Sequence, residues 1–337
     1  MRNADLSLIL KRFKHALILF LKYTTIKKFL NLIRVEYQRR ARADTLTSRA
    51  YCIKVDPTNL CDSGCEYCPH IGSEYPRGKM KLADFKAVID KNKDFAYLAI
   101  MQYSGEPLLN EDIYDMIGYA HSMKVATYMS TNLQHLKAED ADKLIRSGLD
   151  LLTVSIDGVT DDTYNRYRKN GKISVVLDNI RGLVEAKKRL RSAWPIINLQ
   201  YLVMEHNEHQ AAEARALARR LGVDSFELKP VGVTCDMLRL LPKDPRYVRR
   251  VYKKNAGPRQ ACWWLWSAFV VLWDGRVIPC CSPFYKPSEK DNSGNMLSQA
   301  PDEIRNSPAC RQLRRGYPAK NCEDCLIPYG GVLYQTV

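Results

Sequence analysis

Residues 61–68 read CDSGCEYC, and this stretch decides how the rest of the chain is interpreted. Three residues separate Cys61 from Cys65 and two separate Cys65 from Cys68, so one short loop carries all three thiols. Three thiolates on such a loop can hold three irons of a cubane [4Fe–4S] cluster and leave the fourth iron open. An open iron can bind a second molecule, which a cluster with four cysteine ligands cannot do. The stretch therefore predicts an iron–sulfur centre that takes part in a reaction.

Zinc and disulfides are the alternatives for this triplet. Structural zinc prefers four ligands, usually in paired Cys-x2-Cys units, and the triplet fits that pattern poorly. Disulfides need an oxidising compartment, and we expect no cleavable secretory signal at the start of the chain. Reduced thiols in the cytoplasm, serving as iron ligands, explain the eleven cysteines of the chain better.

The segment around the triplet alternates short β-rich runs with helical patterns, which predicts βα units and a parallel sheet. Strands are predicted at 51–55, 97–102, 125–130, 151–156, 196–203 and 225–228. Helices are predicted at 82–93, 111–123, 138–147, 174–190 and 209–221. The cysteine loop follows the first strand, at the edge where parallel barrels place their chemistry.

Polar motifs follow the other predicted strands in order. They are Ser104-Gly105-Glu106-Pro107, Ser130-Thr131-Asn132, Ser155-Ile156-Asp157-Gly158 with Tyr164, Tyr167 and Arg168 beyond it, and the segment that ends in Asn207. Together with the cysteine triplet, this series resembles the radical S-adenosylmethionine (radical SAM) superfamily over residues 50–230. The resemblance implies an α/β fold, an open partial (βα)6 TIM-like barrel.

The resemblance also implies roles for individual residues. The open iron would chelate the amino and carboxylate groups of SAM, and Glu106 would pair with the SAM ammonium. Ser104 stands where the family's Gly-Gly-Glu motif has its first glycine, and Leu133 stands where its Thr-Asn-Gly segment has glycine. The residues expected to bind the cofactor are Tyr67, Ser104, Gly105, Glu106, Thr131, Asn132, Ser155, Asp157 and Asn207.

A second group of cysteines lies near the C-terminus. Residues 268–273 and 276–279, joined by Asp274-Gly275, read as a β-hairpin that brings Cys280 back beside Cys262. With Cys322 and Cys325 they make four thiolates, enough for one auxiliary [4Fe–4S] cluster. This region resembles the SPASM and shorter twitch domains appended to radical SAM barrels. A zinc knuckle is the alternative, and whether Cys280 or Cys281 is the ligand stays open.

The domain organisation expected from these patterns is a basic arm at 1–49, the barrel at 50–230, a linker at 231–257 and the auxiliary-cluster domain at 258–337. The arm holds twelve Lys and Arg against three Asp and Glu, a net +9 of the total +15, so we expect no nucleic-acid partner. Its apolar residues recur at helical spacing, but its longest apolar run, 16–21, is too short to span a bilayer. It predicts an amphipathic helix that either lies in a membrane interface or packs on the enzyme or a second subunit. In a membrane interface, the basic residues expected near anionic headgroups are Lys11, Arg12, Lys14, Lys22, Lys27 and Lys28.

The resulting hypothesis is an oxidoreductase-like enzyme. A reduced SAM-bound cluster would cleave SAM, and the 5′-deoxyadenosyl radical would take a hydrogen atom from the substrate. The electron would come from a flavodoxin- or ferredoxin-type donor in the cytoplasm. Oxidation or epimerisation of a hydroxylated small molecule, or of a lipid-linked substrate, is the main hypothesis. A maturase of ribosomally made peptides and a non-catalytic iron–sulfur electron carrier are the alternatives, and Cys281 is a weak candidate for a catalytic hydrogen donor.

Overall fold

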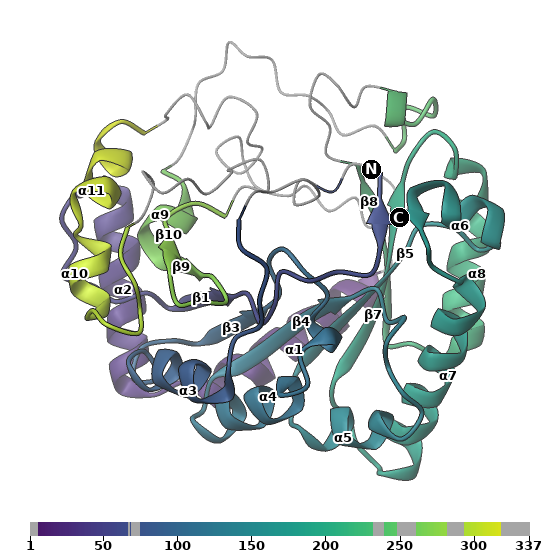
Figure 1. Ribbon diagram of the computed structural model, residues 1–337, viewed down its shortest axis with the longest axis horizontal. Helices are drawn as coiled ribbons and strands as arrows, with labels where there is room; N and C mark the ends of the chain where they lie inside the picture. Colours follow the sequence, from purple (N-terminus) through teal and green to yellow (C-terminus); the bar gives the residue numbers. More distant parts are fainter. Residues whose placement is uncertain are drawn as a thin grey trace.

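An eight-stranded sheet organises the barrel. The computed structural model describes residues 6–66, 68, 75–231, 239–247, 261–281 and 293–317. In sheet order the strands are β10 (Val277–Ile278), β9 (Ala268–Val271), β1 (Cys52–Val55), β3 (Leu98–Met101), β4 (Ala126–Thr131), β5 (Leu151–Ile156), β7 (Ile196–Val203) and β8 (Ser225–Pro230). Neighbouring strands are parallel except β10 and β9. The sheet curves into an open arc (Figure 1), so the predicted partial TIM-like barrel is confirmed.

Helices cover the convex side of this arc (Figure 1). They are α3 (Leu82–Asp90), α4 (Ile113–Ser122), α5 (Asp140–Arg146), α6 (Asp161–Tyr167), α7 (Ile173–Arg189) and α8 (Ala211–Leu221), with the short helices η1 (Pro107–Leu109) and η2 (Glu208–Gln210). Alternate strand residues pack against them: Leu152, Val154 and Ile156 of β5 are fully buried in this core. The residues between them point to the concave side, because successive strand side chains face opposite ways. Helix α6 and a two-stranded ribbon, β2 (Gly64–Cys65) with β6 (Arg168–Lys169), were not predicted.

The C-terminal hairpin is continuous with the barrel sheet. Strand β9 pairs in parallel with β1, with Cys52 opposite Ala268, and β10 returns antiparallel to β9. The sequence predicted the hairpin but not its pairing with the first barrel strand. This pairing places the region that follows Cys262 directly against the strand that leads into the cysteine loop.

The N-terminal arm forms two helices, α1 (Leu6–Tyr23) and α2 (Ile26–Arg40), instead of the single helix predicted. Thr25 separates them and caps α2, since its side chain accepts a hydrogen bond from Lys28 N. Both helices are anchored to the barrel: Tyr23 Oη donates to the buried Asp150 at 2.7 Å, and Arg39 donates to Ala261 O at 2.8 Å. In the described part of the chain, no helix combines the length and apolar character needed to cross a membrane.

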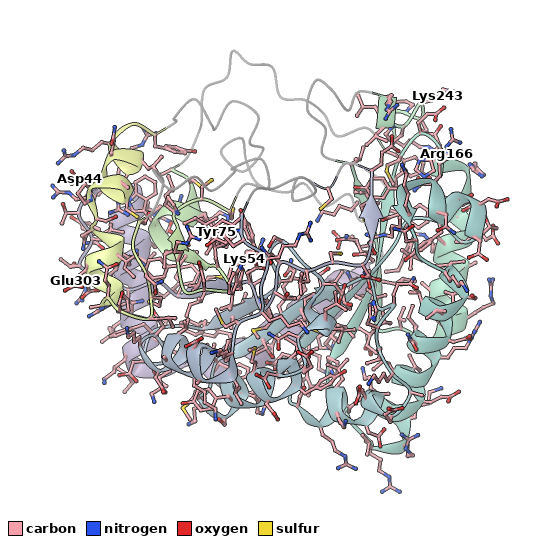
Figure 2. The ribbon with its side chains drawn as sticks, viewed as in Figure 1. Asp44, Lys54, Tyr75, Arg166, Lys243 and Glu303 are labelled. Atoms are coloured by element: carbon pink, nitrogen blue, oxygen red, sulfur yellow. The ribbon has the colours of Figure 1, made fainter. Side chains whose placement is uncertain are left out.

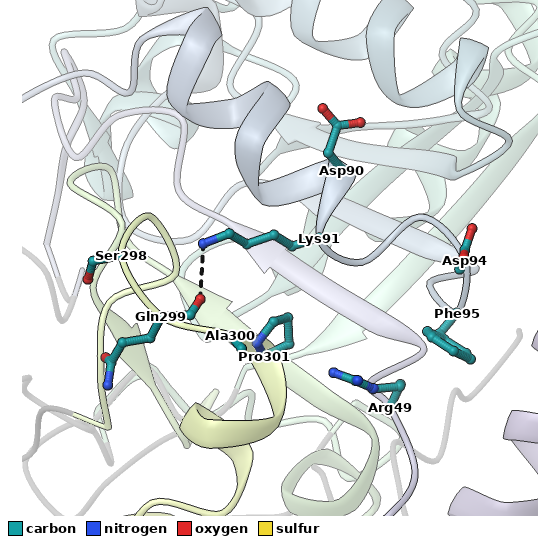
Figure 3. A pocket seen from close by; sticks show the side chains of 9 residues that line it. All are labelled: Arg49, Asp90, Lys91, Asp94, Phe95, Ser298, Gln299, Ala300 and Pro301. Carbon is teal, nitrogen blue, oxygen red and sulfur yellow. Dashed lines mark hydrogen bonds between the residues drawn. The ribbon is translucent and has the colours of Figure 1, made fainter.

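Lys91, just after α3, ties the C-terminal segment to the barrel. Its Nζ donates to the carbonyls of Met296 and Leu297 at 2.6 and 3.1 Å. It also donates to the carbonyl of Gln299 at 3.0 Å (Figure 3). The segment then continues into α10 (Pro301–Arg305) and α11 (Pro308–Arg315), which lie beside the short helix α9 (Trp263–Ser267). A cavity of about 400 Å³ lies next to this contact. Its lining includes Arg49 and Phe95, which precede β1 and β3, so it lies at the opposite end of the strands from the cysteine loop.

Replacing Lys91 with methionine should loosen the 296–299 segment, because one ammonium group satisfies three backbone carbonyls there. Removing hydrogen bonds to a charged group at an exposed site should cost about 1 kcal/mol. Amide hydrogen exchange in residues 294–300 should become faster. Lys93→Met is the matched control, since Lys93 pairs with two side chains of the barrel, Asp90 and Met123. Equal exchange in both variants would show that Lys91 does not hold the segment.

Candidate active site

The cysteine loop leaves the C-terminal end of β1. Cys61 is exposed, Cys65 and Cys68 are partly buried, and all three are free thiols. The β2–β6 ribbon fixes the loop, with Cys65 opposite Arg168, and Cys68 N donates to Cys65 O at 3.1 Å. Burial raises the pKa of the Cys65 thiol, and the nearby Arg168 guanidinium opposes that rise. Tyr67 lies outside the described residues.

Backbone contact brings the segment after β3 against the start of the cysteine loop. A side chain on Gly105 would meet the carbonyl oxygens of Thr58 and Leu60 at 2.2 and 2.5 Å. The next residue, Glu106, donates its backbone N–H to Leu60 O at 2.8 Å. Glycine is required here because the neighbouring atoms are backbone and cannot move aside as a side chain would.

Glu106 connects two of the predicted motifs. Its carboxylate accepts hydrogen bonds from Thr131 Oγ1 at 2.6 Å, Asn132 N at 2.8 Å and Leu108 N at 3.2 Å. Burial raises the pKa of this carboxyl group to about 7, against the effect of these hydrogen bonds. A buried carboxylate beside the cysteine loop can compensate a cationic group at neutral pH.

Asn132 extends this network to the cysteine loop itself. Its Nδ2 donates to Asp62 Oδ1 and to Ser63 Oγ, both at 2.8 Å. The following residue, Leu133, has a φ of +58°, the left-handed conformation that glycine adopts readily. Leucine keeps the turn although the conformation costs about 1–2 kcal/mol, because its side chain is fully buried and Thr131 Oγ1 accepts from its N–H.

Asp157 and Asn207 form a buried set at the ends of β5 and β7. Asp157 accepts from Arg168 Nε at 2.5 Å and from Leu202 N at 2.9 Å. The Asn207 side chain accepts from Met204 N and donates to the carbonyls of Asp157 and Leu202. Asn207 therefore positions Asp157 and uses both amide hydrogens within the protein. Ser155 is also buried and faces the concave side of β5.

Ser104 contacts a residue that sequence reasoning missed. Its Oγ donates to Asp56 Oδ2 at 2.5 Å and its N–H donates to Oδ1 at 3.1 Å. Asp56 follows β1, is almost fully buried, and has its pKa raised to about 6 by that burial. A single aspartate after a strand carries no distinctive sequence signal, although its place directly before the cysteine loop could have drawn attention.

The cysteines of the C-terminal group lie near the same strand. Cys262, Cys280 and Cys281 all pack against a cluster that includes Cys52, Trp264 and Ile278. Cys322 and Cys325, predicted to complete the ligand set, lie outside the described residues. In the part of the chain that is described, no three His, Cys, Asp or Glu side chains converge as a single metal ion requires.

A hydrogen-bonded contact links the two cysteine regions. Tyr75 Oη donates to both carboxylate oxygens of Asp274, in the hairpin turn, at 2.9 Å, and Arg276 lies 4.3 Å above the Tyr75 ring. Tyr75 and Lys54 lie on the concave side of the sheet (Figure 2). Burial there lowers the pKa of Lys54, and the proximity of Cys281 and Asp56 opposes that shift. Lys54 Nζ lies 5.0 Å from the centre of the Tyr103 ring, and Tyr103 packs against the same apolar cluster as Cys281.

The family models identify both parts of the chain. The model of the radical SAM superfamily matches residues 55–225, and that of the SPASM iron–sulfur cluster-binding domain matches residues 262–326. The chain belongs to the radical SAM superfamily and carries a SPASM domain. The cofactors predicted from the sequence are confirmed at this level: a SAM-binding [4Fe–4S] cluster, SAM and an auxiliary iron–sulfur cluster.

Curated relatives and solved structures agree with this assignment. Pre-heme d1 synthase of Dinoroseobacter shibae is 26% identical over 51% of this chain, and the match covers 41% of the synthase, less than half of its length. Mycofactocin maturase MftC of Mycobacterium ulcerans is 23% identical over 81% of this chain and 79% of its own. The crystal structure of Streptococcus suis SuiB bound to S-adenosylmethionine matches 84% of this chain and 71% of that chain with a TM-score of 0.64. At 12% identity, that likeness shows the fold alone.

Adding one methyl group at Gly105 should disturb the cysteine loop. Gly105→Ala should reduce SAM-dependent formation of 5′-deoxyadenosine at least tenfold, because the new Cβ would collide with backbone at 58–60. Gly182→Ala is the control: this glycine lies within α7 with nothing within 4 Å of the added Cβ, and alanine there should stabilise the helix by about 0.5–1 kcal/mol. A Gly105→Ala protein with unchanged activity would show that the close approach is not needed.

Proposed function

We propose that this enzyme removes a hydrogen atom from a peptide substrate. The observation that supports it is the similarity to PqqA peptide cyclase of Gluconobacter oxydans, which is 23% identical over 55% of this chain and 50% of its own length. The match to the mycofactocin maturase reaches across both the barrel and the C-terminal region. The sequence favoured a hydroxylated small molecule or a lipid-linked substrate, with peptide maturation as the alternative. The comparisons support the alternative better.

The free thiols of Cys61, Cys65 and Cys68 fit a cluster with one open iron, and we propose them as its ligands. When bound, the cluster and SAM supply a 5′-deoxyadenosyl radical that can remove a hydrogen atom from a C–H bond. Glu106 would accept a hydrogen bond from the SAM amino group, and Asn132 would keep the cysteine loop in place through Asp62 and Ser63. For the auxiliary cluster we propose Cys262, Cys280, Cys322 and Cys325. A flavodoxin- or ferredoxin-type protein of the cytoplasm would supply the electron.

The concave side of the sheet supports a polar substrate. Its side chains include Lys54 on β1, Gln200 on β7 and Lys229 on β8, and Lys229 Nζ lies 3.4 Å from Gln200 Oε1. Tyr128 Oη donates to Thr153 Oγ1 at 3.3 Å on the same side. These side chains pair with one another and make the concave side polar. A peptide can exchange hydrogen bonds with such a surface, whereas a lipid chain cannot.

A deuterium-transfer experiment tests the substrate class. Cells grown in D2O would be extracted and separated into peptide, polar-metabolite and lipid fractions, and each would be incubated anaerobically with reconstituted enzyme, SAM and dithionite. The peptide fraction should increase the mass of 5′-deoxyadenosine by one unit. Deuterium transfer from only the metabolite or lipid fraction would contradict the peptide proposal.

Cys65→Ala is the control for this experiment, because the proposed cluster should not cleave SAM without one of its three ligands. It should form no 5′-deoxyadenosine with any fraction. Cys310→Ala, which changes a buried thiol in α11, should behave like the unmodified protein.

SAM binding should depend on pH through Glu106. Because burial raises the pKa of this carboxyl to about 7, the group is protonated as the pH falls below 7 and becomes a weaker hydrogen-bond acceptor for the SAM amino group. Calorimetric titration of reconstituted enzyme should give a Kd for SAM about tenfold higher at pH 6 than at pH 8. Glu106→Gln should bind more weakly at pH 8 and show little change between these pH values. The same slope in both proteins would exclude Glu106 as the partner.

A further inference from the structure

We propose that α1 and α2 attach this protein to an anionic membrane surface through their outer face. That face is formed by the exposed side chains of Leu17, Ile18, Leu21, Ile26, Phe29, Leu30, Ile33 and Tyr37. They are eight of the nine large hydrophobic residues that are exposed in the described part of the chain, and Trp263 is the ninth. Exposure reaches 67% for Leu21 and 81% for Ile26. An apolar face of this kind marks an interaction site.

The opposite face of the two helices is already occupied by the barrel. Phe20 stacks on Tyr97, Lys28 Nζ donates to Lys124 O, and Asn31 exchanges two hydrogen bonds with the backbone of Arg49. The barrel therefore holds the two helices in place through their inner face. Packing on the enzyme does not explain why the outer face is apolar. The sequence left two hypotheses for this arm, packing on the enzyme and lying in a membrane interface. Packing on the enzyme describes the inner face of α1 and α2, and the membrane interface is proposed for the outer face.

Charge favours an anionic lipid surface over a second copy of the chain. Residues 6–40 contain nine Lys and Arg and one acidic residue, Glu36, a net of +8. Glu36 is itself paired with Arg39 and Arg40. Two such faces would repel each other, whereas each basic residue near an anionic membrane gains about 1 kcal/mol.

Not every lysine expected at the membrane can contribute. Lys28 is 1% exposed and turned to the barrel, so the prediction that it lies near headgroups was wrong. Lys22 pairs with Asp150 at 3.1 Å but keeps 35% of its side chain exposed. Lys14, Lys27 and Arg34 are exposed beside the apolar residues of the outer face. Lys27 pairs with Asp94 at 3.3 Å, but 71% of its side chain remains exposed. They are suited to contact lipid phosphates while the leucines and isoleucines enter the interface.

The outer face lies at the opposite end of the barrel from the cysteine loop. The helices contact Tyr97, Lys124 and Asp150, which precede β3, β4 and β5, whereas the cysteine loop follows β1. Figure 1 shows α1 passing behind the arc of strands. A protein attached in this way turns its active site toward the aqueous phase. Membrane attachment is therefore independent of the proposed peptide substrate and does not require a lipid substrate.

Vesicle co-sedimentation of the full chain, reconstituted with its clusters, tests this proposal. The protein should pellet with vesicles of three parts phosphatidylcholine and one part phosphatidylglycerol, and at least tenfold less with phosphatidylcholine alone. Raising NaCl to 0.5 M should weaken the binding without abolishing it, because salt screens the charges but not the apolar contact.

A triple substitution, Ile26→Ser with Leu30→Ser and Ile33→Ser, should reduce anionic-vesicle binding at least tenfold. It should leave the circular dichroism and the SAM-dependent formation of 5′-deoxyadenosine unchanged. Trp263→Ser, which removes the exposed apolar side chain outside the outer face, should bind like the unmodified protein. Absence of binding to anionic vesicles would overturn the proposal. A second result would also overturn it: light scattering shows that the unmodified protein is a dimer, and the triple substitution makes it a monomer that still binds vesicles. The outer face would then join two copies of the chain.

Discussion

The close approach of residues 104–106 to the backbone at 58–60 is the contact on which the site depends. It requires glycine at 105, because any side chain there would meet Thr58 O and Leu60 O. It places the buried Glu106 beside the cysteine loop, where its carboxylate accepts hydrogen bonds from Thr131 and Asn132. The Asn132 side chain in turn donates to Asp62 and Ser63. Residues from three strand ends are thus held together by backbone contact and by one buried hydrogen-bond network, before any cofactor binds. Such a preorganised network can hold a bound cofactor in a single orientation.

Much of this arrangement could be predicted from the sequence. Strand positions followed from β-rich runs with turn residues between them, and the motifs at the strand ends fall on one edge because parallel strands share a direction. The three motif residues Glu106, Thr131 and Asn132 do lie together, as their order along the chain indicated. The motif identified Gly105 from the sequence. The backbone oxygens of Thr58 and Leu60 that exclude a side chain there could not be predicted.

Other features depend on contacts between distant residues, which local patterns do not show. The pairing of β9 with β1 joins residues more than two hundred positions apart. The sequence therefore predicted the hairpin as part of a separate domain and not as part of the barrel sheet. The short ribbon that sets Cys65 against Arg168 is too small to leave a periodic signal. The sequence did not indicate that the Asn207 side chain donates to the carbonyls of Asp157 and Leu202. The spacing of apolar residues in α1 and α2 likewise did not predict which face the barrel covers.

Electron paramagnetic resonance of the dithionite-reduced protein tests most directly whether Cys61, Cys65 and Cys68 hold a cluster with an open iron. A variant with Cys262→Ala and Cys280→Ala would remove the signal of the auxiliary cluster and leave that of the triplet. Adding SAM to this variant should change the g-values of the remaining [4Fe–4S] signal, because SAM would bind the open iron. A signal that is the same with and without SAM would contradict an open iron at the triplet.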